Sequence, residues 1–291
     1  MGFRTVIIRD KCKLKYKDGY LIVRNDQINM IHLSEINTLM IDSTMVTITT
    51  YLISELLNKK IKVIFCDQKR NPIGEIVQYY GAHNSSKRIS LQISWDQNIK
   101  CILWKNLIKQ KIFYQADVLK RCNNDNYKTL MEYYESVKEN DSTNREGHAA
   151  KVYFNSLFGK DFSREDDNSI NAALDYGYSI LLSAFNKAIV SKGYLTQLGI
   201  FHRNEFNPFN LSCDLMEPFR PIVDYYVYKN KERVFDKEYR LDLINLLNKK
   251  VVYNKKSYYL NDCIPRYTNN VLEYLSQGQI RNKNFLYYYE L

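Results

Sequence analysis

The hydrophobic period of the chain changes near residue 80, and this change constrains the fold more than any other feature of the sequence. Before it, short runs rich in β-branched and aromatic residues follow one another, and Asp18-Gly19 between two of them is typical of a type I′ hairpin turn. After it, apolar residues recur every three to four positions over long segments with few glycines or prolines. The sequence therefore predicts an α+β fold, with a small β-rich N-terminal domain at residues 1–80 and a larger all-α-helical domain at residues 81–291.

The same patterns predict individual elements. In the first domain we expect one helix, and strands at 5–9, 13–16, 20–24, 28–33, 36–41 and 61–66; the helix follows from apolar residues at helical spacing over 46–58. In the second we expect long helices at 87–122, 127–137, 145–158 and 169–191. Gly159 and Gly193 follow the last two of these segments, as glycines beyond a helix C-terminus do. The Asn-rich segment 198–210 has no period and is predicted to be a loop.

Other features exclude several classes of protein. The apolar run before Arg9 and Asp10 is only three residues long, 6–8, and no later run approaches the ~20 apolar residues that a membrane span needs. The six cysteines contain no C-x-x-C pair, so neither a zinc ribbon nor a redox motif is expected. We therefore expect a cytoplasmic protein that does not contact a membrane.

The charge distribution points toward nucleic acid. The chain has 42 Lys and Arg against 32 Asp and Glu, a net charge of +10, yet residues 161–225 contain 9 acidic and 5 basic side chains. A basic protein with a carboxylate cluster is typical of metal-dependent enzymes that act on phosphodiesters, because the cation neutralises the carboxylates where the phosphate approaches. A solvated acidic helix start at 161–167 is the alternative. The 25 tyrosines fit either a stacking groove or a compositional bias.

Glu146 is the first candidate site residue. It shares a helical stripe with Ala150, Tyr153 and Leu157, which places a carboxylate on a face that should be buried. An unpaired buried carboxylate is costly, so a cation or a hydrogen-bond network should accompany it. The alternative is a capping box, because Thr143 precedes Glu146 by three residues.

A second group follows in the sequence. His202 lies in the predicted loop, and Asp214 and Glu217 would share one face of a helix after it. Pro218 disfavours α geometry at the preceding residue, so we expect the helix to be kinked or interrupted at Glu217. Spacing alone makes this a weak indication of a metal site.

Three segments containing these residues resemble a known family. Residues 144–154 (NREGHAAKVYF), 199–204 (GIFHRN) and 214–224 (DLMEPFRPIVD) are similar to motifs of the CRISPR-associated spacer-acquisition integrases, the Cas1 family, and especially to its type II branch. The strand-rich start and the run 61–67 also resemble that family. The resemblance extends over essentially the whole chain, with the three motifs in the family's order.

The resemblance implies a fold, an activity and partners. It implies that the helical domain is catalytic, that the protein is a prokaryotic homodimer, and that two dimers flank a dimer of the small Cas2 protein. It also implies insertion of double-stranded DNA fragments into a CRISPR array by transesterification of their 3′-hydroxyls, together with metal-dependent endonuclease activity. The family's metal-binding triad carries over to Glu146, His202 and Glu217, where many relatives have Asp at the last position. Asp214 matches a further frequent acid of less certain role.

Two carboxylates and one imidazole suit Mg²⁺ or Mn²⁺, and the nitrogen ligand favours tighter binding of Mn²⁺. We expect His202 to be a ligand; a general base is the alternative. Arg145, Lys151, Arg203 and Arg220 flank the motifs and are expected to contact DNA phosphates. A DNA-binding scaffold without catalysis and a stand-alone endonuclease are the competing functions. The presence of all three triad residues favours an enzyme over the scaffold, whereas the stand-alone endonuclease would use the same site and differ only in its products.

Overall fold

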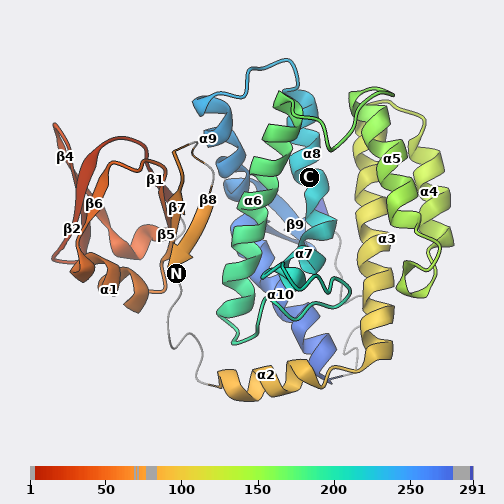
Figure 1. Cartoon of the computed structure of the whole chain (residues 1–291), viewed down its shortest axis with the longest axis horizontal. Helices are drawn as coiled ribbons and strands as arrows, with labels where there is room; N and C mark the ends of the chain where they lie inside the picture. The colour runs from red at the N-terminus through yellow and green to blue at the C-terminus, as the bar shows by residue number, and fades with distance from the viewer. Residues whose placement is uncertain (1–3, 69, 71, 77–83, 278–288, 291) are drawn as a thin grey trace. The chain divides into compact units, whose positions relative to one another are not determined.

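A computed structural model describes residues 4–68, 70, 72–76, 84–277 and 289–290. The chain divides into two compact units, Met1–Gly81 and Ala82–Leu291. Figure 1 shows strands in the first unit and mostly helices in the second. The domain boundary predicted at residue 80 falls within 77–83, outside the described residues.

The N-terminal unit contains two four-stranded sheets. One has the order β1 (Arg4–Ile8), β5 (Ile36–Ile41), β7 (Lys62–Cys66), β8 (Pro72–Ile76), and its pairs are parallel except β7 with β8. The other has the order β4 (Ile28–His32), β3 (Tyr20–Arg24), β2 (Cys12–Lys17), β6 (Val46–Ile48). Asp18 and Gly19 join β2 to β3 with φ of 50° and 86°, so the predicted hairpin turn is confirmed.

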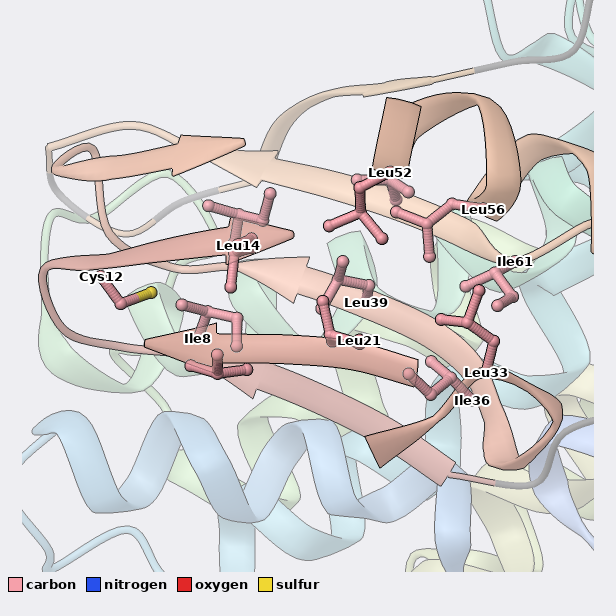
Figure 2. Packing of buried hydrophobic residues seen from close by; sticks show 13 residues of the cluster. Ile8, Cys12, Leu14, Leu21, Leu33, Ile36, Leu39, Leu52, Leu56 and Ile61 are labelled. Carbon is pink, nitrogen blue, oxygen red and sulfur yellow. The ribbon is translucent and has the colours of Figure 1, made fainter. Parts of the chain in front are cut away.

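One buried cluster draws residues from both sheets and from helix α1 (Thr50–Asn58). Figure 2 shows Leu52 and Leu56 of α1 directed toward strand residues that include Leu14, Leu21 and Leu39. The helix predicted over 46–58 is wrong in its first part, because residues 46–48 pair in parallel with β2 instead. The Thr49 side chain accepts a hydrogen bond from the Leu52 amide, which starts the helix only after that strand.

The C-terminal unit is built from nine described helices: α2 (Ser85–Ile93), α3 (Gln97–Arg121), α4 (Tyr127–Ser136), α5 (Arg145–Phe158), α6 (Ser169–Val190), α7 (Asn210–Met216), α8 (Arg220–Lys229), α9 (Lys237–Asn245) and α10 (Leu260–Gln277). The single helix predicted over 87–122 is two helices, since Asp96 accepts from the amides of Asn98 and Ile99 and caps α3. The end of α5 at Gly159, with φ of 109°, is confirmed. The loop predicted over 198–210 extends to residue 209.

The α+β fold class with a mostly helical second part is confirmed. The helical unit also contains a three-stranded sheet that the sequence did not indicate, in the order β10 (Lys256–Tyr259), β9 (Lys250–Tyr253), β11 (Tyr289–Glu290). None of the described helices is both long and apolar enough to cross a membrane.

Helix α3 positions the candidate site. It packs against α4 and α5 along its length and also contacts α8 and the single 3-10 turn η3 (Glu217–Phe219) between α7 and α8. Figure 1 shows α3 in yellow beside the green helices α4 and α5. Side chains from α3, α5 and η3 therefore meet inside this unit.

Candidate active site

Glu146 and Glu217 meet on one lysine. The ammonium nitrogen of Lys111, on α3, lies 2.6 Å from Oε1 of Glu146 on α5 and 2.5 Å from Oε2 of Glu217 at the start of η3. Lys111 is 9% exposed and Glu217 is 3% exposed. Burial disfavours the charged ammonium, but the two carboxylates outweigh this effect and raise the pKa of Lys111. The three groups form an ion network in which Lys111 and Glu217 are buried and Glu146 is partly exposed.

The start of α5 directs Glu146 to this network. Asp141 accepts hydrogen bonds from the Arg145 and Glu146 amides at 2.9 and 3.0 Å, and Asn144, in the left-handed conformation, accepts from the Gly147 amide at 3.3 Å. Glu146 is therefore the second residue of the helix, and its carboxylate contacts Lys111. The capping-box alternative with Thr143 is wrong.

The interruption predicted at Glu217 is confirmed. Helix α7 ends at Met216, a 3-10 turn contains Pro218, and α8 begins at Arg220. The Arg220 Nε donates to Oε1 of Glu217 at 2.9 Å, and its guanidinium lies over the ring of Tyr178. Burial favours the neutral acid, but Arg220 and Lys111 outweigh it and lower the pKa of Glu217 to about 2. Glu217 is thus a carboxylate with both oxygens engaged.

A second buried acid lies beyond Arg220. The Tyr178 hydroxyl donates to Oδ1 of Asp224, which is 1% exposed. Burial raises the pKa of Asp224 to about 6, although hydrogen bonding from Tyr178 and the charge of Arg220 act in the opposite direction. Asp224 therefore anchors the aromatic ring on which Arg220 rests.

His202 is held by Asp214. The Asp214 carboxylate accepts from the Ile200, Phe201 and His202 amides at 2.5, 3.1 and 3.2 Å, and its Oδ1 lies 2.6 Å from Nδ1 of His202. A Cβ at Gly199 would lie 2.8 Å from Oδ2, so this close approach requires glycine.

These four contacts use both oxygens of Asp214, whose exposure is 0%. Asp214 thus orients the imidazole through Nδ1, and Nε2 is the ring nitrogen that this contact leaves available. The hydrogen bond to Asp214 raises the pKa of His202 against the effect of burial, and the charges of Glu217 and Glu146 contribute in the same direction. Trp104 supports the loop by stacking on Phe201, with ring centroids 4.4 Å apart.

The structure brings the predicted residues together in two groups. Glu146 and Glu217 share Lys111, and His202 pairs with Asp214. Within the described part of the chain, no three His, Cys, Asp or Glu side chains are arranged as a metal site. The donor set nevertheless fits Mg²⁺ or Mn²⁺. One oxygen of each glutamate already contacts the same cationic group, the Lys111 ammonium, which takes the place that a metal ion would occupy.

The four basic candidates differ in their surroundings. Lys151 and Arg203 are exposed, and Arg203 also donates to Oε1 of Gln97 at 3.0 Å. Arg145 is partly exposed, with its guanidinium over the ring of Tyr133. Arg220 is engaged by Glu217 and Tyr178, as described above.

Sequence reasoning missed three residues of the site: Lys111, Asp141 and Asp224. A signal existed for Lys111, which follows Trp104 and Leu107 on the buried stripe of α3 at helical spacing, so a lysine stood where an apolar residue was expected. Asp141 and Asp224 carry no comparable signal, because their partners are backbone amides and a tyrosine from another helix.

The chain combines a β-rich N-terminal unit with a helical unit that contains a cluster of acidic and basic side chains, and the comparisons identify its family. The profile of the family described as CRISPR associated protein Cas1 matches residues 5–243. The CRISPR-associated endonuclease Cas1 of Neisseria meningitidis serogroup C (strain 8013) is 35% identical over 229 residues, which cover 78% of this chain and 75% of the relative. The chain belongs to the Cas1 family, as its motifs indicated.

Solved structures share the fold. A casposase bound to its integration product superposes with a TM-score of 0.78 at 21% identity, covering 97% of this chain and 93% of the casposase. A chain of a Cas6-RT-Cas1–Cas2 complex superposes with a TM-score of 0.72 at 19% identity, covering 95% of this chain and 35% of that longer one.

Proposed function

We propose that this chain is the DNA integrase of CRISPR adaptation, which joins the 3′-hydroxyl ends of a DNA fragment to a CRISPR array and also cleaves DNA as an endonuclease. The single observation that carries the proposal is that Glu146 and Glu217 converge on one cationic nitrogen, that of Lys111. Each glutamate is 35 residues or more from Lys111 in the sequence. Two carboxylates directed at one cation, one buried and one partly exposed, suit phosphoryl transfer with a divalent cation.

The proposed ligands are one oxygen each from Glu146 and Glu217 and Nε2 of His202. Asp214 fixes the imidazole so that its second nitrogen is free to bind. Arg220 neutralises part of the charge of Glu217 and holds its carboxylate in place. A bound Mg²⁺ or Mn²⁺ would supply the positive charge that polarises the scissile phosphate and favours the 3′-alkoxide.

The proposed reaction is balanced without an external energy source. The 3′-oxygen of the incoming strand forms a new P–O bond at the array phosphate, the bond to the array strand's own 3′-oxygen breaks, and the proton passes from one hydroxyl to the other. Hydrolysis, the endonuclease activity, uses water as the nucleophile in place of the 3′-hydroxyl. No covalent intermediate with the protein is required.

DNA binding is proposed to use the basic residues. Arg145, Lys151, Arg203 and Arg220 flank the site motifs, and the net charge of +10 favours a polyanionic partner. The proposed assembly is a homodimer, two copies of which flank a dimer of Cas2. The structural likeness to chains of Cas1–Cas2 and casposase complexes supports this proposal at the level of the fold.

The test is a strand-joining assay. The purified protein, its Cas2 partner, a short duplex with free 3′ ends and a supercoiled plasmid with the array are incubated with Mn²⁺, and covalently joined products are separated on a denaturing gel. Glu217→Gln should lower the joining rate at least ~100-fold, as expected when a charged group that holds the reacting phosphate's counter-ion is lost.

Glu205→Gln is the matched control, because Glu205 is an exposed acid in the same loop as His202. Its joining rate should equal that of the wild type. If Glu217→Gln forms joined products at the normal rate, the proposed site is refuted. If the wild type binds DNA but forms no joined product, the non-catalytic scaffold is favoured.

A further inference from the structure

We propose that Lys111 is a built-in competitor for the divalent cation, so that metal binding at Glu146 and Glu217 must displace the lysine ammonium. This inference rests on the proposed function, because it concerns the same metal site. Lys111 then has a role in the metal-free protein that neither carboxylate can perform.

The contacts of Glu217 carry the first step. Its Oε1 accepts from Nε of Arg220 at 2.9 Å, and its Oε2 contacts Nζ of Lys111 at 2.5 Å. An arginine remains charged at any pH that the protein tolerates, so Oε1 stays engaged. Oε2 is therefore the oxygen of Glu217 without an arginine partner, and it is the oxygen that Lys111 holds.

Glu146 leads to the same conclusion. Its Oε1 lies 2.6 Å from the Lys111 nitrogen, and this nitrogen is the point at which both glutamates meet. Mg²⁺ binds carboxylate oxygens at about 2.0–2.1 Å, closer than an ammonium does. The ion and the ammonium would occupy the same space, and they cannot bind the two oxygens together.

Burial explains why a lysine is present. Lys111 and Glu217 are 9% and 3% exposed, and the carboxylates of Glu217 and the partly exposed Glu146 would repel each other without a cation between them. The ammonium removes this repulsion when no metal is bound. Replacing Lys111 by a neutral residue should thus lower the stability of the metal-free protein and raise the affinity of the site for metal.

The experiment measures Mn²⁺ binding to the full-length chain by isothermal titration calorimetry, with thermal unfolding in EDTA and in Mn²⁺ as a second readout. Lys111→Gln should bind Mn²⁺ about tenfold more tightly than the wild type, because no ion pair has to be broken. Its melting temperature should be lower in EDTA and should rise more on addition of Mn²⁺.

Lys109→Gln is the matched control. Lys109 lies on the same helix, and its contact with the exposed Glu135 is 3.7 Å long. This variant should bind Mn²⁺ like the wild type. Equal or weaker Mn²⁺ binding by Lys111→Gln would overturn the inference.

A measurement on the wild type covers the case in which Lys111→Gln does not fold. Acetylation of Lys111 by acetic anhydride, followed by mass spectrometry of its peptide, should be several-fold faster in Mn²⁺ than in EDTA, because a displaced amine becomes reactive. An unchanged rate would overturn the inference. If Glu217→Gln binds Mn²⁺ as tightly as the wild type does, the metal site of the proposed function is refuted instead.

Discussion

The Asp214→Asn substitution tests how His202 is positioned. The asparagine has the same shape, but one of the two carboxylate oxygens becomes an NH₂ donor. Oδ2 faces the Ile200 and Phe201 amides, and Oδ1 faces the amide and Nδ1 of His202. In either orientation of the amide, a donor faces two other donors.

The magnitude follows from these contacts. At least two hydrogen bonds to a charged acceptor are lost, each worth about 1.5–3 kcal/mol, at a carboxylate of 0% exposure. We expect the free energy of unfolding to fall by about 3 kcal/mol or more. Strand joining should fall ~10–100-fold beyond any loss of folded protein, because the imidazole is no longer oriented.

Urea unfolding followed by tryptophan fluorescence measures the stability change. Both tryptophans, Trp95 and Trp104, belong to the helical unit, and Trp104 stacks on Phe201 of the affected loop. Asp242→Asn is the control, because Asp242 pairs with Arg233 at the surface and should contribute less than ~1 kcal/mol. A change of less than ~1 kcal/mol for Asp214→Asn, with normal joining, would refute the positioning role.

Three further predictions concern charge. Glu146→Gln should abolish joining yet change the unfolding free energy by less than ~1 kcal/mol, because Lys111 keeps its pair with Glu217; a large loss of stability in a chemical denaturation curve would contradict this. Burial raises the pKa of Asp224 from 3.8 to about 6, so the folded state holds this proton more tightly than the unfolded chain does. The resulting stability, about 3 kcal/mol, should be complete below about pH 4 and lost as pH rises through 6, and the difference between the wild-type and Asp224→Asn profiles measures it. Duplex affinity should fall steeply between about 50 and 200 mM salt, and Arg203→Gln should flatten the log–log slope by about 0.9 in a fluorescence anisotropy titration; equal affinity at both salt concentrations would exclude a basic DNA-binding surface.

Local signals predicted most elements of the fold. The hairpin at Asp18-Gly19, the end of α5 at Gly159 and the break at Pro218 depend on the conformational preferences of single residues, and all three are confirmed. Residues 46–48 have helical spacing but form a strand, because pairing with β2 outweighs the local preference.

The candidate site was predictable only in part. The sequence indicated a costly buried carboxylate at Glu146, but not its partner, because Lys111 lies 35 residues away on another helix. The capping-box alternative failed for a local reason, since Asp141 and Asn144, and not Thr143, accept from the first amides of α5. Roles that depend on contacts between distant elements cannot be read from spacing within one element.

The dependence of strand joining on Mn²⁺ concentration, for the wild type and His202→Ala, tests the central claim most directly. If Glu146, His202 and Glu217 hold the catalytic cation, the variant should need a much higher Mn²⁺ concentration, regain part of its rate at saturation and bind DNA as tightly as the wild type. A general base at His202 would instead give a low rate that Mn²⁺ cannot restore. Superimposable curves for the two proteins would contradict the metal-binding triad.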